Sequence, residues 1–192
     1  MPRVDNEKFY TSAINMHGVT PKGVNWNSKN SQEIRFKMIL QMLPFNLKEF
    51  SIVDAGCGFG DFYTYALKKK KEFTYIGIDA LSDMYSIASE KTGCEILVAD
   101  ICTEDIPKAS YYVCSGAMNT LERFETHLFI RKCYEASKKG FIFNILHGDK
   151  KSQTYNYFTT AQIHEIANDL KVKKVILRDD YLDADITVGF FK

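Results

Sequence analysis

Apolar residues occur in two alternating patterns along most of this chain. Short continuous apolar runs, typical of strands buried on both faces, alternate with segments in which apolar residues recur every three or four positions, which is typical of helices with one buried side. The runs that predict strands cover residues 51–55, 73–78, 95–99, 111–114, 141–146, 172–178 and 185–191. The segments that predict helices begin near residues 30, 61, 82, 119 and 159.

This alternation predicts an α/β protein with a Rossmann-like, three-layer α/β/α architecture around a mostly parallel seven-stranded sheet. The connection between the last two strands is too short for a right-handed crossover, so we expect the last strand to be antiparallel. Residues 30–192 are expected to form this domain. Residues 1–29 are expected to form a separate N-terminal lid or substrate-binding segment.

The helix boundaries follow from capping residues. Asn30 with Glu33 and Thr159 with Gln162 have capping-box spacing, and the first helix should stop at Pro44. Its buried face is expected to contain Phe36, Ile39, Leu40 and Leu43. The helix that begins at Asp61 is expected to run through the lysines at 68–71, and the helix over 82–91 to bury Met84, Ile87 and Ala88.

The helix after the fourth strand is expected to begin at an Asn119 cap. Leu121, Phe124 and Leu128 would then face inward, and Gly140 would end the helix. The final helix should bury one face, formed by Ile163, Ile166, Ala167 and Leu170.

Residues 1–28 show neither pattern and contain many turn-forming residues, so we expect them to be irregular. So long a loop at the front of a compact domain is unusual and is typical of a lid or a binding segment. A loosely ordered terminus is the alternative. The aromatic residues Tyr10 and Trp26 favour docking onto the domain.

Composition excludes several classes of protein. The chain is 45% hydrophobic and 26% charged with a net charge of +1, so it has no overall attraction to nucleic acid or anionic membranes. It has no hydrophobic leader and no apolar run that could span a bilayer. The four lysines at 68–71 favour a solvated helix end over a nucleic-acid site. We therefore expect no nucleic-acid partner, no membrane association and a cytoplasmic location.

Five cysteines are present, and their spacing fits neither a zinc site nor a CxxC redox pair. We expect buried free thiols in a reducing compartment, and no metal site.

Candidate chemistry begins where the first strand runs into Asp54-Ala55-Gly56-Cys57-Gly58-Phe59-Gly60. Glycines let the backbone turn sharply and let a ligand approach it, and the following helix start presents free N–H groups. A carboxylate at the entrance would repel a pyrophosphate, so Asp54 favours a ligand with a cationic or ammonium group.

The next two strands also end in carboxylates, Asp79 and Asp100. Ligands of open α/β sheets lie at these strand ends, and an acid about twenty residues beyond the glycine turn suits ribose hydroxyls. Asp100 can accept from an exocyclic amine, and the N–H of Ile101 can donate to a ring nitrogen. The NAD fingerprint would place its third glycine at position 61, which is Asp61. The predicted ligand is therefore a nucleoside without a pyrophosphate.

The glycine turn, Asp79 and Asp100 together resemble the first three motifs of class I S-adenosylmethionine-dependent methyltransferases, over about residues 30–191. The resemblance implies S-adenosyl-L-methionine as cofactor and S-adenosyl-L-homocysteine as product. It places the glycines near the methionine part, Asp54 at its amino group or a water, Asp79 at the ribose and Asp100 with Ile101 at adenine. The residues it assigns to the cofactor are Asp54, Gly56, Gly58, Gly60, Asp79, Ala80, Asp100, Ile101 and Ser115.

The segments Asn25-Trp26-Asn27-Ser28 and Gln32-Glu33-Ile34-Arg35-Phe36 also resemble a subset of small bacterial methyltransferases of undefined substrate. Ser115-Gly116-Ala117-Met118 differs from the Asn/Asp-Pro-Pro-aromatic sequence of enzymes that methylate the amino groups of adenine or glutamine. No Pro-Cys pair occurs, so Cys114 fits a core thiol better than the nucleophile of cytosine methylation.

We therefore expect a small-molecule acceptor, methylated by in-line displacement, in a monomer or a homodimer. Candidate substrate residues are Tyr10, Trp26, Arg35, Asn119 and His147. His147, Asn144, Asn119, His17 and Tyr10 are candidates for a general base, each with packing or capping as the alternative, so no catalytic residue is assigned.

Arg35 is a candidate for binding a carboxylate of cofactor or substrate, with an exposed helix arginine as the alternative. The competing hypothesis for the whole chain is a protein that binds the cofactor but serves as a non-catalytic regulatory or partner subunit.

Overall fold

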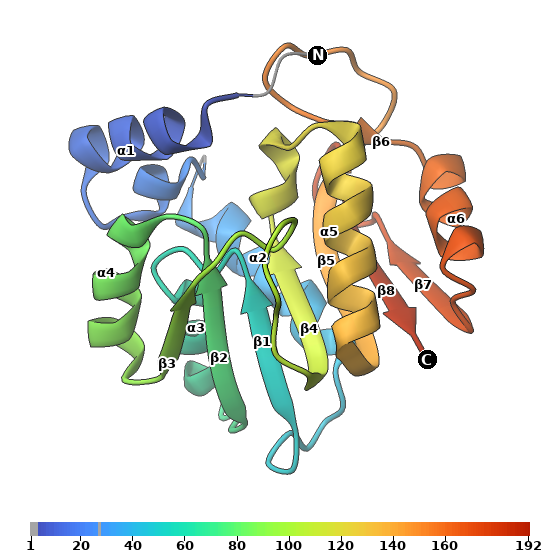
Figure 1. The fold of residues 1–192 in the computed structure, drawn as a ribbon, viewed down its shortest axis with the longest axis horizontal. Coiled ribbons are helices and arrows are strands. Elements are labelled where there is room, and N and C mark those ends of the chain that lie inside the picture. Colours follow the sequence, from blue (N-terminus) through green and yellow to red (C-terminus); the bar gives the residue numbers. More distant parts are fainter. Residues whose placement is uncertain (1–3, 27) are drawn as a thin grey trace.

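The computed structural model describes residues 4–26 and 28–192 (Figure 1). Residues 1–3 of the predicted N-terminal segment and Asn27 of the 25–28 motif lie outside the described residues. The helices are α1 (Asn6–His17), α2 (Lys29–Met42), α3 (Asp61–Lys68), α4 (Ser82–Thr92), α5 (Arg123–Ala136) and α6 (Thr160–Asp169), with 3-10 helices η1 (Pro21–Val24) and η2 (Ala117–Thr120). The strands are β1 (Ser51–Ala55), β2 (Thr74–Asp79), β3 (Glu95–Val98), β4 (Ala109–Ser115), β5 (Ser137–His147), β6 (Tyr157–Phe158), β7 (Lys174–Arg178) and β8 (Asp185–Phe191).

The strands form one sheet in the order β3-β2-β1-β4-β5-β8-β7. Neighbouring strands are parallel except for β8, which runs antiparallel to both β5 and β7. This order confirms the predicted Rossmann-like fold with an antiparallel last strand. The two-residue strand β6, which pairs with β5 outside this path, was not predicted because so short a strand leaves no apolar run.

Helices cover both faces of the sheet, as three layers require. One hydrophobic core joins α2, α3 and α4 to the sheet through residues such as Phe36, Phe62 and Ala88. The other joins α5 and α6 through residues such as Ile130 and Ile163. Figure 1 shows α5 in front of the sheet and α2 behind it. The predicted buried face of α2 is confirmed, since Phe36, Ile39, Leu40 and Leu43 are all buried.

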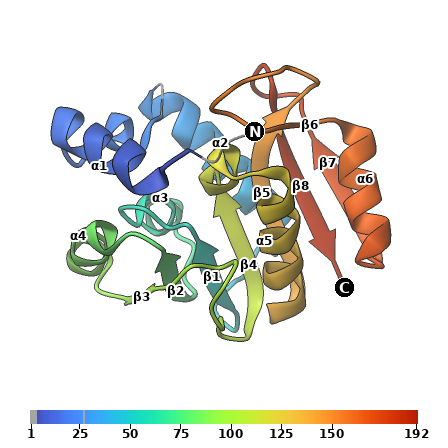
Figure 2. The ribbon, with the colours of Figure 1, turned by 45° about the horizontal axis from the view of Figure 1, so that its top comes forward.

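The N-terminal segment is not irregular, contrary to the prediction. Asp5 caps α1 by accepting a hydrogen bond from the N–H of Lys8 at 3.1 Å, and η1 follows. The prediction missed α1 because the short apolar repeat of Phe9, Tyr10, Ala13 and Ile14 stands among turn-forming residues; only Ala13 of α1 is buried. Figure 2 shows α1 lying across the end of the sheet at which β1, β2 and β4 finish.

The predicted register of α5 was wrong. The helix begins at Arg123, and Glu122 forms a capping box with Glu125. Phe124 is therefore 75% exposed, while Leu121 and Leu128 are only half-buried. The buried face consists instead of Thr126, Phe129, Ile130, Cys133, Tyr134 and Ala136.

Gly140 does not end α5, because it lies inside β5 and pairs with Phe191 of β8. Two other boundaries differ as well. Ser28 rather than Asn30 caps α2, accepting from Ser31 N at 3.1 Å, and α3 ends at Lys68 so that the lysine run mostly follows it. The Thr159–Gln162 capping box is confirmed, whereas Ile87 and Leu170 are only half-buried.

Within residues 4–26 and 28–192, no helix has both the length and the apolar character needed to cross a bilayer.

Candidate functional site

A cavity of about 460 Å³ lies at the carboxyl ends of β1, β2 and β4, beneath α1 and η1. Two sides can be distinguished. The strand-end side is formed by residues 54, 56–59, 79–80 and 100–101, and the α1 side by residues 6, 7, 9, 10, 26, 117, 119–121 and 155. Every residue predicted to bind the cofactor lines the cavity except Gly60. Among the candidate substrate residues, Tyr10, Trp26 and Asn119 line it, whereas Arg35 and His147 do not.

The glycine turn is tied directly to β2. Gly56, Gly58 and Gly60 all have positive φ, at 76°, 52° and 73°, a region that only glycine adopts without strain. The N–H groups of Gly56 and Cys57 donate to Ile78 O at 2.7 and 3.0 Å. Gly60 serves as the N-cap of α3 and packs toward α4, which explains why it lies outside the cavity wall.

Asp79 holds the turn from the other side. Its Oδ2 accepts from Gly58 N at 2.8 Å, and its Oδ1 accepts from Leu81 N at 3.1 Å. Burial raises the pKa of Asp79, and these backbone hydrogen bonds act against that shift. The carboxylate thus lies at the cavity wall with its orientation fixed by the backbone.

Asp54 lies deeper than Asp79. It is 3% exposed and accepts a hydrogen bond from Tyr75 Oη at 2.9 Å. Burial raises the pKa of Asp54 to about 7, and the Tyr75 hydrogen bond opposes this increase. Asp54 is therefore a buried acid that a cationic ligand can ionise.

The end of β3 is held by hydrogen bonds between residues close in the sequence. Asp100 Oδ1 accepts from Cys102 N at 2.8 Å, and Asp100 N donates to Glu104 Oε1 at 2.8 Å. Ile101, which is 3% exposed, lies between them and lines the cavity.

Asn119 does not cap α5, contrary to the interpretation from sequence. Its Oδ1 accepts from Leu146 N in β5 at 3.2 Å, and its backbone carbonyl accepts from Asn156 N at 2.8 Å. Asn119 therefore joins η2 to β5 and to the loop before β6.

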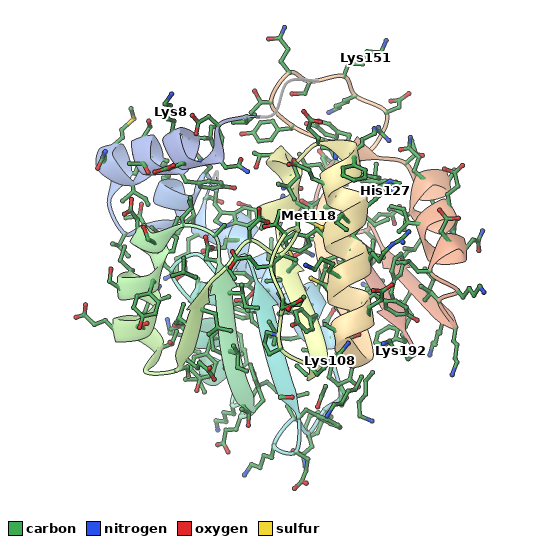
Figure 3. All side chains as sticks on the ribbon, in the orientation of Figure 1. Lys8, Lys108, Met118, His127, Lys151 and Lys192 are labelled. Carbon is green, nitrogen blue, oxygen red and sulfur yellow. The ribbon has the colours of Figure 1, made fainter. Side chains whose placement is uncertain are left out.

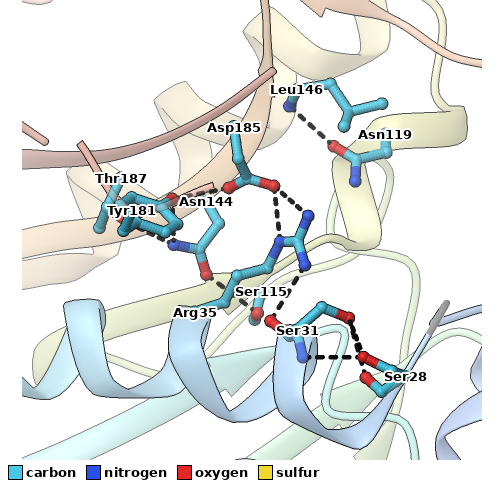
Figure 4. A network of polar contacts seen from close by, with 10 residues as sticks. All are labelled: Ser28, Ser31, Arg35, Ser115, Asn119, Asn144, Leu146, Tyr181, Asp185 and Thr187. Carbon is cyan, nitrogen blue, oxygen red and sulfur yellow. Dashed lines mark hydrogen bonds and ion pairs between the residues drawn. The ribbon is translucent and has the colours of Figure 1, made fainter. Parts of the chain in front are cut away.

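Arg35 binds a carboxylate of its own chain. Its Nε donates to Asp185 Oδ2 at 2.6 Å, the two side chains form an ion pair, and both are largely buried, at 11% and 1% exposure (Figure 4). The alternative of an exposed helix arginine is therefore wrong. The guanidinium also lies 4.6 Å from the centre of the Trp26 ring.

The ion pair continues into a hydrogen-bond network that reaches the cavity. Tyr181 Oη donates to Asp185 Oδ1 at 2.6 Å, and Thr187 Oγ1 donates to Tyr181 Oη at 2.8 Å. Asn144 Nδ2 donates to Thr187 Oγ1 at 2.6 Å, and Ser115 Oγ donates to Asn144 Oδ1 at 3.0 Å (Figure 4). The network thus links β8 to the cavity wall at Ser115.

His147 lies at the end of β5, where its Nε2 is 3.1 Å from Thr160 Oγ1. Sequence reasoning missed Asn6, Phe9, Thr120 and Tyr155, which all line the cavity. The overlooked helix α1 explains the first two, and no sequence signal marks the others. Met118, labelled in Figure 3, is fully buried beneath this side.

Comparisons with known proteins agree on one family of folds. Residues 52–140 match the family model described as "Methyltransferase domain". No curated protein sequence matches the chain.

Three solved structures illustrate the likeness. Magnesium protoporphyrin IX methyltransferase from Synechocystis PCC 6803 with bound SAH matches with a TM-score of 0.67 at 13% identity, over 88% of this chain and 89% of that chain. A chain in the complex between the Haloferax volcanii Trm112 methyltransferase activator and a putative methyltransferase matches with a TM-score of 0.74 at 16% identity. The match covers 96% of this chain and 97% of that chain. A SAM-dependent methyltransferase from Leishmania major matches with a TM-score of 0.70 at 15% identity, over 96% of this chain and 83% of that chain.

At these identities the structural likeness concerns the fold, while the family model covers the glycine turn and the strand ends that form the cavity. Residues 52–140 therefore resemble a methyltransferase domain, and the chain has the Rossmann-like fold of these methyltransferase structures.

Proposed function

We propose that this protein binds S-adenosyl-L-methionine at the strand-end side of the cavity and transfers its methyl group to a small-molecule acceptor at the α1 side. The product of the cofactor would be S-adenosyl-L-homocysteine. The observation that carries the proposal is Asp79, which lies at the cavity wall beside Gly58 and is held there by two backbone N–H groups.

The residues present fit such a cofactor. Asp79 can accept from ribose hydroxyls, and Asp54 can ionise next to the amino group or the sulfonium. Gly58 lines the cavity without a side chain, so that a ligand can reach the backbone there. Asp100 and Ile101 also line the cavity, which supports the proposal that they hold the adenine.

When bound, the cofactor supplies a methyl group on a positively charged sulfur, which is an activated donor. The residues of this chain then have three tasks: to orient the donor, to place the acceptor in line behind the methyl carbon, and to exclude water. Residues 4–26 support the last task, since Asp5, Tyr10 and Trp26 all line the cavity. We therefore propose that the N-terminal segment covers the site as a lid.

Calorimetric titration with S-adenosylmethionine and S-adenosylhomocysteine tests the proposal. We expect both to bind, and Asp79→Ala to weaken both about 10- to 100-fold, because hydrogen bonds to charged groups contribute about 1.5–3 kcal/mol. Asp169→Ala, at the end of α6, serves as the matched control with unchanged affinity. Failure of both ligands to bind would overturn the proposal.

A non-catalytic subunit that binds the cofactor is the second candidate. It is raised by the complex of the Trm112 methyltransferase activator with a putative methyltransferase, in which a chain of this fold occurs together with a partner. Incubation with labelled S-adenosylmethionine and a metabolite extract separates the two candidates. The enzyme hypothesis predicts labelled small molecules, whereas the partner hypothesis predicts binding without transfer.

A further inference from the structure

Two buried oxygen atoms on the α1 side make no hydrogen bond of normal geometry within residues 4–26 and 28–192, although the Thr120 hydroxyl lies close enough to Tyr10 to act against the rise in the pKa of Tyr10. They are Asn6 Oδ1, at the start of α1, and Thr120 Oγ1, at the end of η2. Both residues line the cavity, and Thr120 is only 4% exposed. Figures 1 and 2 both show the start of α1 beside the turn that leads into α5. A buried polar atom without a partner is costly, so the pair indicates a ligand that donates hydrogen bonds.

The charge of the cavity wall narrows the class of ligand. Six of the described lining residues are acidic, of which Asp5 is paired with Lys8, Asp61 is paired with Lys91 and Asp54 has a raised pKa; they are Asp5, Glu7, Asp54, Asp61, Asp79 and Asp100, and no Lys, Arg or His is among the described lining residues. The lysines of the flanking segments, Lys8 and Lys151, point away from the molecule (Figure 3). The N-terminus of α1 would attract an anion, but Asp5 already caps it and forms an ion pair with Lys8. This arrangement repels an acceptor with a carboxylate or a phosphate.

Hydrogen bonding and charge together distinguish an amine from an alcohol as the methyl acceptor. The amide oxygen of Asn6 can only accept, and Thr120 Oγ1 can accept as well as donate. An alcohol can satisfy both oxygens by donating to Asn6 Oδ1 and accepting from Thr120 Oγ1, but it is neutral and gains nothing from the acidic residues of the wall, whose described lining residues include no Lys, Arg or His. An amine offers two hydrogens, and its protonated form offers three, so one nitrogen can satisfy both.

Aromatic rings on the same side fit the rest of such a molecule. The cavity is lined by four aromatic residues, Phe9, Tyr10, Trp26 and Tyr155. The rings of Phe9 and Tyr10 pack edge to face, with 5.3 Å between their centroids. Aromatic faces attract cations as well as apolar groups. Burial raises the pKa of Tyr10 to about 12, so its hydroxyl remains a neutral donor or acceptor near neutral pH.

We propose that the methyl acceptor is a small amine with an apolar or aromatic body, and that its nitrogen lies between Asn6 Oδ1 and Thr120 Oγ1. This proposal rests on the proposed function. The bound cation first releases one proton to solvent at the mouth beside exposed Glu7. The nitrogen lone pair then forms a bond to the methyl carbon while the bond from that carbon to sulfur breaks. The sulfur keeps that electron pair and becomes a neutral thioether, and the methylated nitrogen becomes an ammonium group.

A matched panel tests the substrate class. Each apolar or aromatic body is presented as an amine, an alcohol and a carboxylate, for example 2-phenylethylamine, 2-phenylethanol and phenylacetate. Binding to protein saturated with S-adenosylhomocysteine is followed by saturation-transfer NMR, and methyl transfer by labelled S-adenosylmethionine. We expect binding and transfer to be confined to amines.

Transfer to alcohols or carboxylates, or absence of amine binding while the cofactor still binds, would overturn the amine proposal and leave the cofactor site intact. Failure of the cofactor itself to bind would overturn the proposed function instead.

Variants of the two oxygens test the position of the nitrogen. Asn6→Leu and Thr120→Val should each weaken the binding of the best amine about tenfold, while the Kd for S-adenosylhomocysteine changes less than about twofold. Thr120→Ser keeps the hydroxyl and should keep the affinity. Asn168→Leu makes the same substitution at an exposed position of α6 and controls for effects of an Asn-to-Leu change that do not involve the cavity. Unchanged amine affinity in both variants, or an equal loss of cofactor affinity, would overturn the proposed position.

Discussion

The two sides of the cavity are held together in different ways. On the strand-end side, Gly58 bonds to Asp79, and both belong to one β–α–β unit of about thirty residues. On the α1 side, the walls come from residues near 10, 26, 119 and 155, which are far apart in the sequence. Their positions depend on long-range contacts such as Arg35 with Asp185 and Asn119 with Leu146.

The difference has a functional meaning. A donor site made from a turn and two strand ends forms wherever the parallel sheet forms, so it can stay the same while the acceptor changes. An acceptor site assembled from separate segments can change its shape through substitutions that leave the sheet intact. Breaking a long-range contact should therefore disturb the α1 side and spare the strand-end side.

The largest effect is expected for Arg35→Ala. Removing one partner of a buried ion pair leaves Asp185 buried without its cation, which should lower the free energy of unfolding by about 3–5 kcal/mol. Trp26 also loses the cation that lies over its ring. Urea denaturation measures the loss, with Lys37→Ala on the exposed side of α2 as control.

The same variant tests the comparison directly. In the folded fraction of Arg35→Ala, we expect the Kd for S-adenosylhomocysteine to stay within about twofold, since Arg35 does not line the cavity. Acceptor binding should weaken, because Trp26 does line it. An equal loss of affinity for S-adenosylhomocysteine and for the acceptor would show that the two sides of the cavity form one unit. It would contradict the view that they are held together in different ways.

An intermediate effect is expected for Gly116→Ala. An added Cβ would lie 2.6 Å from Cη2 of Trp26, and the residue has a φ of 82°. Gly93→Ala offers a matched control, with a φ of 65° but no atom within 4 Å of the added Cβ. Both variants carry the backbone strain, and only Gly116→Ala displaces the Trp26 ring.

We expect Gly116→Ala to be less stable than Gly93→Ala by about 1–3 kcal/mol, the usual cost of overpacking, as measured by urea denaturation. Its tryptophan fluorescence should also shift, because Trp26 is the only tryptophan in the chain. Equal stability and unchanged fluorescence would show that Trp26 is not fixed against the turn.

The difference between local contacts on the strand-end side and long-range contacts on the α1 side also determines what could be predicted from the sequence. Residues 51–55 were predicted as a strand and are β1, because continuous burial leaves an apolar run that can be read locally. Asp79 and Asp100 follow such runs, so their place at one edge of the sheet also follows from the sequence.

The α1 side could not be predicted in this way. Helix α1 buries only Ala13, and its short apolar repeat of Phe9, Tyr10, Ala13 and Ile14 is too weak a signal beside the surrounding turn-forming residues. Asn119 has the side chain of a good helix cap, but it accepts from Leu146, which lies 27 residues away. Arg35 was expected to bind a carboxylate of the cofactor or the substrate, but its partner is Asp185 of its own chain, 150 residues away. Local patterns do not contain contacts of this range.

The last effect concerns the strand-end side, and it is measured as a dependence of stability on pH and not as a loss at one pH. The pKa of Asp54 is about 7 in the folded protein and 3.8 as its ordinary value. Its contribution to stability is therefore fully present below about pH 4 and is lost as pH rises toward 7, by at most about 1.4 kcal/mol per pH unit. Asp54→Asn lacks this titration. The difference in unfolding free energy between wild type and Asp54→Asn, measured in urea from pH 4 to 8, should follow this slope, and parallel curves would contradict it.

Ligand binding offers a sharper form of the same test. A cationic cofactor next to Asp54 favours its carboxylate form, so binding at pH 6 should release a proton from a group that is largely protonated in the free protein. Calorimetry at pH 6 in two buffers of different ionisation enthalpy measures that release. We expect it to vanish at pH 8, where Asp54 is already ionised, and in Asp54→Asn at either pH. Proton release that persists in Asp54→Asn would assign the titration to another group, and the strand-end side would then hold the cofactor without the help of its deepest carboxylate.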